Sequence, residues 1–304
     1  MLPQLSASQA TAAPCESVAD WWQRHRAIAR EHTDPIHQAI VGGFVADRVG
    51  WAFASGYQAA LRAVFPDAPT NRICALCVTE TDGNSPKAIK STLRKSGDGW
   101  LLNGAKRWTT LGPDGALFFV AARDEAASGE RAVIRVARVD SNAAGLKIEN
   151  MPPAKFVPEV PHAQLHFKDV AVASLLPGDG YDEYVKPFRT VEDIHVQAAV
   201  LAYLMREGQR LSWPRDWLER LSALLAALGK LSDMPASHAE THVALAGALA
   251  FGSGLIGETE AFWEKAGADP AAERWKRDRE LLKVAGGIRA QRTKRAWEKL
   301  RQVG

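Results

Sequence analysis

The sequence predicts an α+β protein in which helices precede and follow a central β-sandwich or barrel. Three observations support this order. Apolar residues recur at helical spacing before residue 65. Short runs of Val, Ile, Leu and Phe alternate with turn residues from 72 to about 177, and Ala- and Leu-rich stretches fill the remainder. We therefore expect an N-terminal helical domain over 1–71, a β-domain over 72–180 and a C-terminal helical domain over 181–304.

The N-terminal domain is expected to consist mainly of helices. Val18, Trp21, Trp22 and Ile28 share one face of a helix over 18–31. Asp34-Pro35 marks a second helix start, because proline is tolerated in the first turn. We expect Gly42-Gly43 to interrupt the helical stretch that follows, up to residue 64. Residues 1–14 indicate a loose tail, since they have neither the basic start nor the apolar core of a signal peptide.

The β-domain should contain one hairpin that the sequence marks strongly. Asn103-Gly104 is a strong two-residue turn signal, because both central positions of a type I′ turn need positive φ. Trp100, Leu101 and Leu102 would end one strand, and 106–110 would form the return strand. The expected strands are 73–79, 89–95, 100–103, 106–110, 117–122, 132–139 and 164–167.

The C-terminal domain is expected to hold four helices. Pro214, Pro235 and Pro270 each lie where a helix should begin. The expected helices cover about 184–211, 214–231, 236–266 and 271–302. Four leucines of the second helix, with few neighbours to cover them, favour a homodimer or a higher homo-oligomer; they are Leu221, Leu224, Leu225 and Leu228.

Composition excludes several classes of protein. A net charge of +3 over 304 residues gives no argument for nucleic acid or membrane binding. No run of about 18 apolar residues occurs, so we expect no membrane-spanning helix.

Cys74 and Cys77 form a CxxC pair, which is compatible with redox or metal chemistry. Burial as small hydrophobic residues is the better interpretation, because the pair lies in an apolar strand. With Cys15 as an unpaired third cysteine, a reducing, cytoplasmic location is expected.

Two separated motifs carry a family resemblance. The first is Thr79-Glu80 followed by the polar loop Gly83-Asn84-Ser85. The second is Leu102-Asn103-Gly104-Ala105-Lys106-Arg107-Trp108-Thr109-Thr110, about twenty residues later. Together they resemble the middle domain of the acyl-CoA dehydrogenase family, over about residues 72–190. The resemblance identifies the chain as a divergent, C-terminally shortened member of that family.

The resemblance implies FAD as cofactor and names the residues that contact it. Trp108 would lie against one face of the isoalloxazine ring, and Thr79, Thr109 and Thr110 would surround it, with a Thr near N5. The alternative is that these residues are β-formers that pack a sheet. Ser85 matches a loop serine near the phosphopantetheine of the substrate, although the family usually has Gly-Ser-Asp there. Its alternative is an ordinary polar turn.

The implied reaction is oxidation of an acyl-CoA to the 2,3-enoyl-CoA, with electrons passed to an electron-transfer flavoprotein. It needs a carboxylate base whose pKa burial raises toward neutrality. Most of the family place this Glu in a late Tyr-Glu-Gly-Thr-like loop, which this sequence lacks. A minority place it at the start of the first C-terminal helix, where this chain has Glu192. Asp193 stands where the family has Arg, and its charge would raise the pKa of Glu192 further.

Other functions stay open at this point. Thr190 is compatible with a helix N-cap, with Glu192 and Asp193 complementing the helix dipole. A non-catalytic flavin-binding, acyl-CoA-binding or interaction module is the first alternative, and a flavin monooxygenase or oxidase is the second. His238 and His242 share a helix face, but no third metal ligand follows, so no metal is expected. The family's pyrophosphate-binding stretches match this sequence only weakly, at Ala285-Gly286-Gly287.

Overall fold

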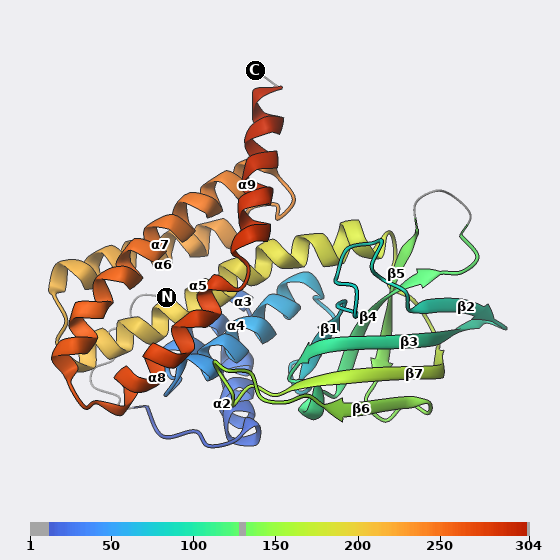
Figure 1. Cartoon of the computed structure of the whole chain (residues 1–304), viewed down its shortest axis with the longest axis horizontal. Helices are drawn as coiled ribbons and strands as arrows, with labels where there is room; N and C mark the ends of the chain where they lie inside the picture. The colour runs from blue at the N-terminus through green and yellow to red at the C-terminus, as the bar shows by residue number, and fades with distance from the viewer. Residues whose placement is uncertain (1–11, 128–131, 303–304) are drawn as a thin grey trace. The chain divides into compact units, whose positions relative to one another are not determined.

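The structure is a computed structural model that describes residues 12–127 and 132–302 (Figure 1). The tail expected over 1–14 lies largely outside the described residues. The chain forms two compact units. The helical unit comprises Met1–Ala63, Lys155–Glu159 and Thr190–Gly304, and the β-unit comprises Val64–Ala154 and Val160–Arg189. The predicted order of helices, sheet and helices is confirmed. The three-domain division stays a prediction.

Within the described residues, the helical unit begins with α2 (Val18–Glu31), α3 (Pro35–Phe44) and α4 (Val49–Val64). The Asp34 carboxylate caps α3 by accepting from the Ile36 amide, and Pro35 occupies the first turn as predicted. The expected interruption of the helical stretch is present but lies at 45–48 rather than at Gly42-Gly43, because α3 continues to Phe44. A Cβ at Gly43 would overlap the carbonyl group of Ala199 on α5. The glycine therefore permits two helices to approach closely.

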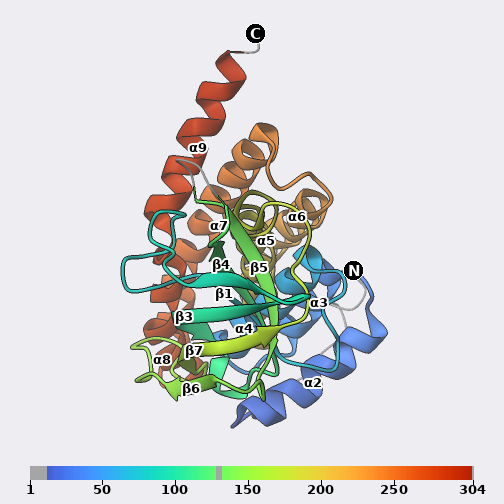
Figure 2. The same cartoon turned by 90° about the vertical axis from the view of Figure 1, so that its right-hand side faces the viewer.

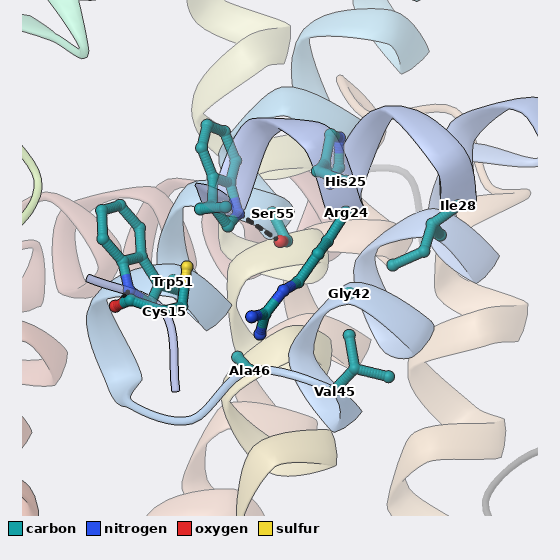
Figure 3. A pocket seen from close by; sticks show the side chains of 10 residues that line it. Cys15, Arg24, His25, Ile28, Gly42, Val45, Ala46, Trp51 and Ser55 are labelled. Carbon is teal, nitrogen blue, oxygen red and sulfur yellow. Dashed lines mark hydrogen bonds between the residues drawn. The ribbon is translucent and has the colours of Figure 1, made fainter. Parts of the chain in front are cut away.

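Aromatic side chains pack α2 against α4, as Figure 3 shows. Trp21 and Trp51 stack with ring centroids 5.9 Å apart, and the Trp21 indole donates to the Ser55 hydroxyl over 3.0 Å. His25 is buried beside them, and burial holds its pKa well below the usual value, with the nearby Arg62 adding to the effect. The cavity drawn in Figure 3 measures about 10 Å³, which is at the limit for a single water molecule. This region is therefore helix packing.

The β-unit is built on one curled sheet (Figure 2). Its strand order is β1-β4-β2-β3-β7-β6, with β5 on the other side of β4. Strands β1 and β2 run parallel to β4, and the remaining pairs are antiparallel. Leu93, Leu102, Phe118 and Leu165 belong to its buried core. The strands are β1 (Cys74–Cys77), β2 (Thr92–Ser96), β3 (Gly99–Thr110), β4 (Leu117–Asp124), β5 (Ile134–Asp140), β6 (Leu146–Asn150) and β7 (His162–Val172).

The hairpin predicted at Asn103-Gly104 is wrong, because β3 runs through these residues as one strand. The turn lies earlier, at Gly97, where Ser96 pairs with Gly99. At Asn103 the pairing of β3 with β7 shifts register, and the Asn103 amide exchanges hydrogen bonds of 3.0 and 2.9 Å with Asp169. Gly104 has φ +127°, so the Asn-Gly signal marked a bulge rather than a turn.

The C-terminal helices follow a π-helical turn, η2 (Tyr181–Val185). They are α5 (Lys186–Arg210), α6 (Arg215–Ser232), α7 (Ala239–Ala266), α8 (Pro270–Asp278), the 3₁₀ segment η3 (Arg279–Lys283) and α9 (Gly286–Arg301). The single helix predicted over 271–302 is wrong, since it is divided into α8, η3 and α9. Asp278 ends α8, and its buried carboxylate accepts a 2.8 Å hydrogen bond from the Val157 amide. That contact satisfies a buried charge where the helix ends.

The leucines that favoured an oligomer are buried within the chain: Leu221, Leu224, Leu225 and Leu228 are at most 3% exposed. The argument from exposed leucines is therefore wrong, and oligomerisation stays a prediction. Within the described residues, α7 alone is long and apolar enough to cross a membrane by length and composition. It is a core helix of the fold. Leu255 on its buried face accepts a 2.9 Å hydrogen bond from the Trp217 indole of α6.

Replacement of Gly104 by Ala should test the bulge. A Cβ there would lie 2.5 Å from the Ser91 hydroxyl, and φ is positive. We expect Gly104→Ala to lower the free energy of unfolding by about 3 kcal/mol. Gly97→Ala is the matched control. It also has positive φ but meets nothing within 4 Å, and should cost only about 1 kcal/mol. Urea denaturation measures both, and equal losses would contradict the steric argument.

Candidate functional site

A buried ion pair joins the two motifs that the sequence singled out. The Lys106 side chain is fully buried, and its ammonium group lies 2.6 Å from Glu80 Oε1. The same nitrogen donates to the Val78 carbonyl over 3.3 Å. Burial opposes both charges and lowers the pKa of Lys106, whereas the charge of Lys106 holds the pKa of Glu80 below its usual value. Sequence reasoning quoted both residues but gave neither a role.

Glu80 also organises the polar loop after β1. Its Oε1 accepts from the Ser91 amide (3.1 Å) and hydroxyl (2.8 Å), and its Oε2 accepts from the Lys90 amide (2.7 Å). Backbone bonds join Glu80 to Gly83 in both directions. Ser85 lies exposed in this loop, and its hydroxyl accepts a 3.3 Å bond from the Ala88 amide. Ser85 therefore caps a local turn, and its contact with the substrate stays a prediction.

Trp108 is held in an unusual conformation near the end of β3. Its φ is +56°, in the left-handed region that a bulky side chain rarely adopts. The pairing of β3 with β7 shifts register here, between Lys106 and Thr109. The indole is 51% exposed and has the edge of His162 beside it, with ring centroids 5.9 Å apart. Such strain persists only where the surrounding structure enforces it, and it is concentrated at functional sites.

The three threonines of the motifs have different surroundings. The Thr79 carbonyl accepts a 2.8 Å bond from the Arg107 amide, so the end of β1 lies beside the residue preceding Trp108. Thr79 and Thr110 are half-buried, and in the described part of the chain neither hydroxyl has a hydrogen-bonding partner. Thr109 is 1% exposed, and its hydroxyl faces the Cys77 sulfur at 3.8 Å. The structure thus brings two unsatisfied hydroxyl groups and one exposed indole to neighbouring strand ends.

Glu192 lies on α5 in the helical unit and is half-buried. The N-cap alternative is wrong, because α5 begins at Lys186 and Thr190 lies inside it, 1% exposed. The next residue, Asp193, forms the most extensive contacts. Its Oδ1 accepts from Arg289 Nε and Nη2 over 2.9 and 2.7 Å, and its Oδ2 accepts from Arg292 Nη2 over 2.6 Å. Asp193 therefore faces two guanidinium groups, and the expectation that it acts on Glu192 as an uncompensated negative charge is wrong.

The histidines on these helices have ordinary polar partners. His195 Nδ1 lies 2.7 Å from the Val191 carbonyl, and burial lowers its pKa to about 4. His242 Nε2 lies 2.8 Å from the Ala236 carbonyl. Among residues 12–127 and 132–302, no three His, Cys, Asp or Glu side chains are grouped to hold a metal ion. Cys74 and Cys77 are buried and unbridged, and burial raises the pKa of Cys77 to about 12.

Residues 75–170 match the family described as "Acyl-CoA dehydrogenase, middle domain". Over these residues the chain is similar to the middle domain of acyl-CoA dehydrogenases. A curated relative is 3-sulfinopropanoyl-CoA desulfinase of Paraburkholderia xenovorans (strain LB400). It is 30% identical over 99 residues, which are 32% of this chain and 25% of that protein. The chain therefore matches only about a quarter of the length of that relative.

Solved structures share the fold of this chain over nearly its full length. Butyryl-CoA dehydrogenase from Megasphaera elsdenii superposes with a TM-score of 0.72 at 14% identity, covering 92% of this chain and 90% of that one. The FAD complex of PigA superposes with a TM-score of 0.65 at 15% identity, covering 95% and 91%. At such identities the likeness establishes the fold, and the activity has to be argued from the residues.

Replacement of Lys106 should test how far the stability of the β-unit depends on its ion pair with Glu80. We expect Lys106→Met to lower the free energy of unfolding by about 3 to 5 kcal/mol, because a buried carboxylate loses its counter-ion. A second substitution, Glu80→Gln, keeps an acceptor for Ser91 and should recover part of that loss in the double variant. Lys95→Met, on an exposed position of β2, is the control and should change stability by less than about 0.5 kcal/mol. Additive losses in the double variant would contradict the coupling.

Proposed function

We propose that this protein binds FAD and oxidises an acyl-CoA thioester to the 2,3-enoyl-CoA. The observation that carries the proposal is Trp108: its side chain is exposed, its backbone is strained, and its end of β3 adjoins the end of β1 at Thr79. The family supplies the acyl-CoA substrate class, and two relatives, by their names, act on CoA thioesters.

The residues present fit a flavin ring. A flavin needs an apolar or aromatic wall and hydrogen bonds to its ring nitrogens and oxygens. Trp108 supplies the wall, and Thr79 and Thr110 supply two hydroxyl groups that no described residue satisfies. Thr109 would contribute through its backbone, because its side chain is buried against Cys77. When bound, FAD supplies the acceptor for the two electrons removed from the substrate.

The protein's own contribution to the chemistry is a proton acceptor and a fixed geometry. The carbon next to a thioester carbonyl loses a proton, which we assign to the Glu192 carboxylate, while the β-carbon loses a hydride. Asp193 cannot take this role, since both of its oxygens are occupied by arginine. The polar loop that Glu80 holds in place presents Ser85, which we propose to contact the CoA moiety. Electrons would leave to an electron-transfer flavoprotein, and a homodimer is the proposed assembly.

Purified protein should carry flavin absorbance or take up added FAD. We expect Trp108→Ala to weaken FAD binding by about tenfold, because it removes the aromatic wall. Trp297→Ala is the matched control, since Trp297 on α9 is also exposed, by 49%, but lies in the helical unit. Fluorescence titration of FAD measures both. Colourless protein without affinity for FAD would remove the proposal, and equal effects of the two substitutions would remove the role of Trp108.

Replacement of Glu192 by Gln should slow flavin reduction by acyl-CoA by roughly 10²- to 10⁴-fold while FAD stays bound. The substitution keeps size and hydrogen bonding but removes the proton acceptor. Glu219→Gln, at an exposed position of α6, should reduce at the wild-type rate. Stopped-flow absorbance under anaerobic conditions measures the rates over a panel of acyl-CoAs.

Two outcomes would redirect the assignment of function. Wild-type protein that binds FAD and acyl-CoA but is never reduced would indicate a non-catalytic binding module. Glu192→Gln that reduces at the wild-type rate would exclude Glu192 as the base. The next candidates for the base are Glu258 and Glu260 on α7. They are paired with Arg220 and Arg279, respectively, so either would have to leave an arginine to act as a base.

A further inference from the structure

A second cavity lies within the helical unit and has no part in the proposed reaction. It measures about 320 Å³ and is lined from α5, α7, η3 and α9. This volume is at the lower end of the range for small-molecule sites and is far larger than the cavity beside Trp21. Leu249 and Ile256 of α7 and Leu282 of η3 form its apolar walls. Polar groups come from Gln197, Ser253, Glu260 and three cationic side chains.

Gln197 is the most informative residue of this cavity. Its side chain is 5% exposed, yet its amide makes no hydrogen bond to any residue within 12–127 or 132–302. The amide atoms are not fully sealed from solvent, so they are available to a ligand that enters the cavity. The amide nitrogen would lie 2.7 Å from a Cβ at Gly252, so the absence of a side chain there leaves room for it. The Gln197 amide thus lines the cavity and has no hydrogen-bonding partner among the described residues.

The cationic groups give the cavity its charge preference. Arg289 donates through Nε and Nη2 to Asp193 and through Nη1 to the Leu282 carbonyl, which leaves two of its five N–H groups without a partner in the described chain. Lys283 pairs with Glu280, and both side chains are largely exposed. Exposed pairs of this kind contribute little, so Lys283 can turn to a ligand at small cost. Arg279 stands at the same cavity, paired with Glu260.

We propose that this cavity binds a small organic carboxylate with a short apolar chain. The apolar chain would pack on Leu249, Ile256 and Leu282, and a carboxylate oxygen would accept from the Gln197 amide. The charge of the carboxylate would face Lys283 and the unused N–H groups of Arg289. Inorganic phosphate fits less well, because it would leave the apolar side chains of the cavity in contact with water. An alkylammonium ion fits less well, because Glu260, the carboxylate among the described lining residues, is already paired with Arg279.

A steric plug tests the site without disturbing the fold. Gly257 of α7 lines the cavity, and a Cβ there meets nothing within 4 Å. Gly257→Leu should therefore fold, favour the helix and fill the cavity. Gly254→Leu is the matched control, because Gly254 is on the same helix, is equally open and does not line the cavity. The probe is sodium hexanoate, titrated into the full chain and followed by calorimetry and by saturation-transfer NMR, with inorganic phosphate and butylammonium as comparison ligands.

We expect hexanoate to bind the wild type and the Gly254→Leu variant alike, and the Gly257→Leu variant at least about tenfold more weakly. Gln197→Glu, which places a negative charge beside the ligand, should weaken binding as strongly. Lys283→Ala should weaken it by a few fold, and Lys276→Ala, at an exposed position of α8, should leave it unchanged. Absence of hexanoate binding, binding that survives Gly257→Leu, or phosphate or butylammonium binding as tightly as hexanoate would each overturn the proposal.

Discussion

The β-unit depends on the contact between Glu80 and Lys106. This ion pair holds the loop after β1 against the middle of β3, and through it the positions of Thr79, Ser85 and Trp108 are linked. The carboxylate is satisfied by one ammonium group, two backbone amides and one hydroxyl, so its burial is compensated on every side. An ion pair of this kind adds less to stability than to specificity, because few other arrangements satisfy it.

Much of the fold could be predicted from the sequence, because its signals are local. Helical spacing, proline starts and short β-rich runs placed the helices and all strands except β6. The errors came from contacts between residues distant in the chain. Asn103-Gly104 has the composition of a turn, but Asp169, 66 residues later, holds the Asn103 side chain and makes it a bulge. Gly42-Gly43 resembles a break, but α5 packs against it.

The site could be predicted only where a motif named its residues. Trp108, Thr79 and Thr110 were found because a family pattern marked them, and their side chains do lie at neighbouring strand ends. Lys106 was passed over, since a lysine in a strand is ordinarily exposed and nothing local shows that Glu80 neutralises it. The partners of Asp193 were equally hidden, because Arg289 and Arg292 lie 96 and 99 residues further along the chain. The unsatisfied amide of Gln197 is visible only in three dimensions.

In the sequence, the β-unit lies between the first and last parts of the helical unit, and this order has a consequence for biosynthesis. Arg206 on α5 donates to the Ala46 carbonyl across 160 residues, so the first helices find their partners only after the whole β-unit has been made. At roughly 5 to 20 residues per second, the ribosome needs about 8 to 30 seconds to synthesise that stretch. During this time the buried faces of α3 and α4 lack their partners on α5, such as Ala199 and Val196. Before its release from the ribosome, the nascent chain should therefore depend on chaperones more than a chain in which each domain is one continuous segment.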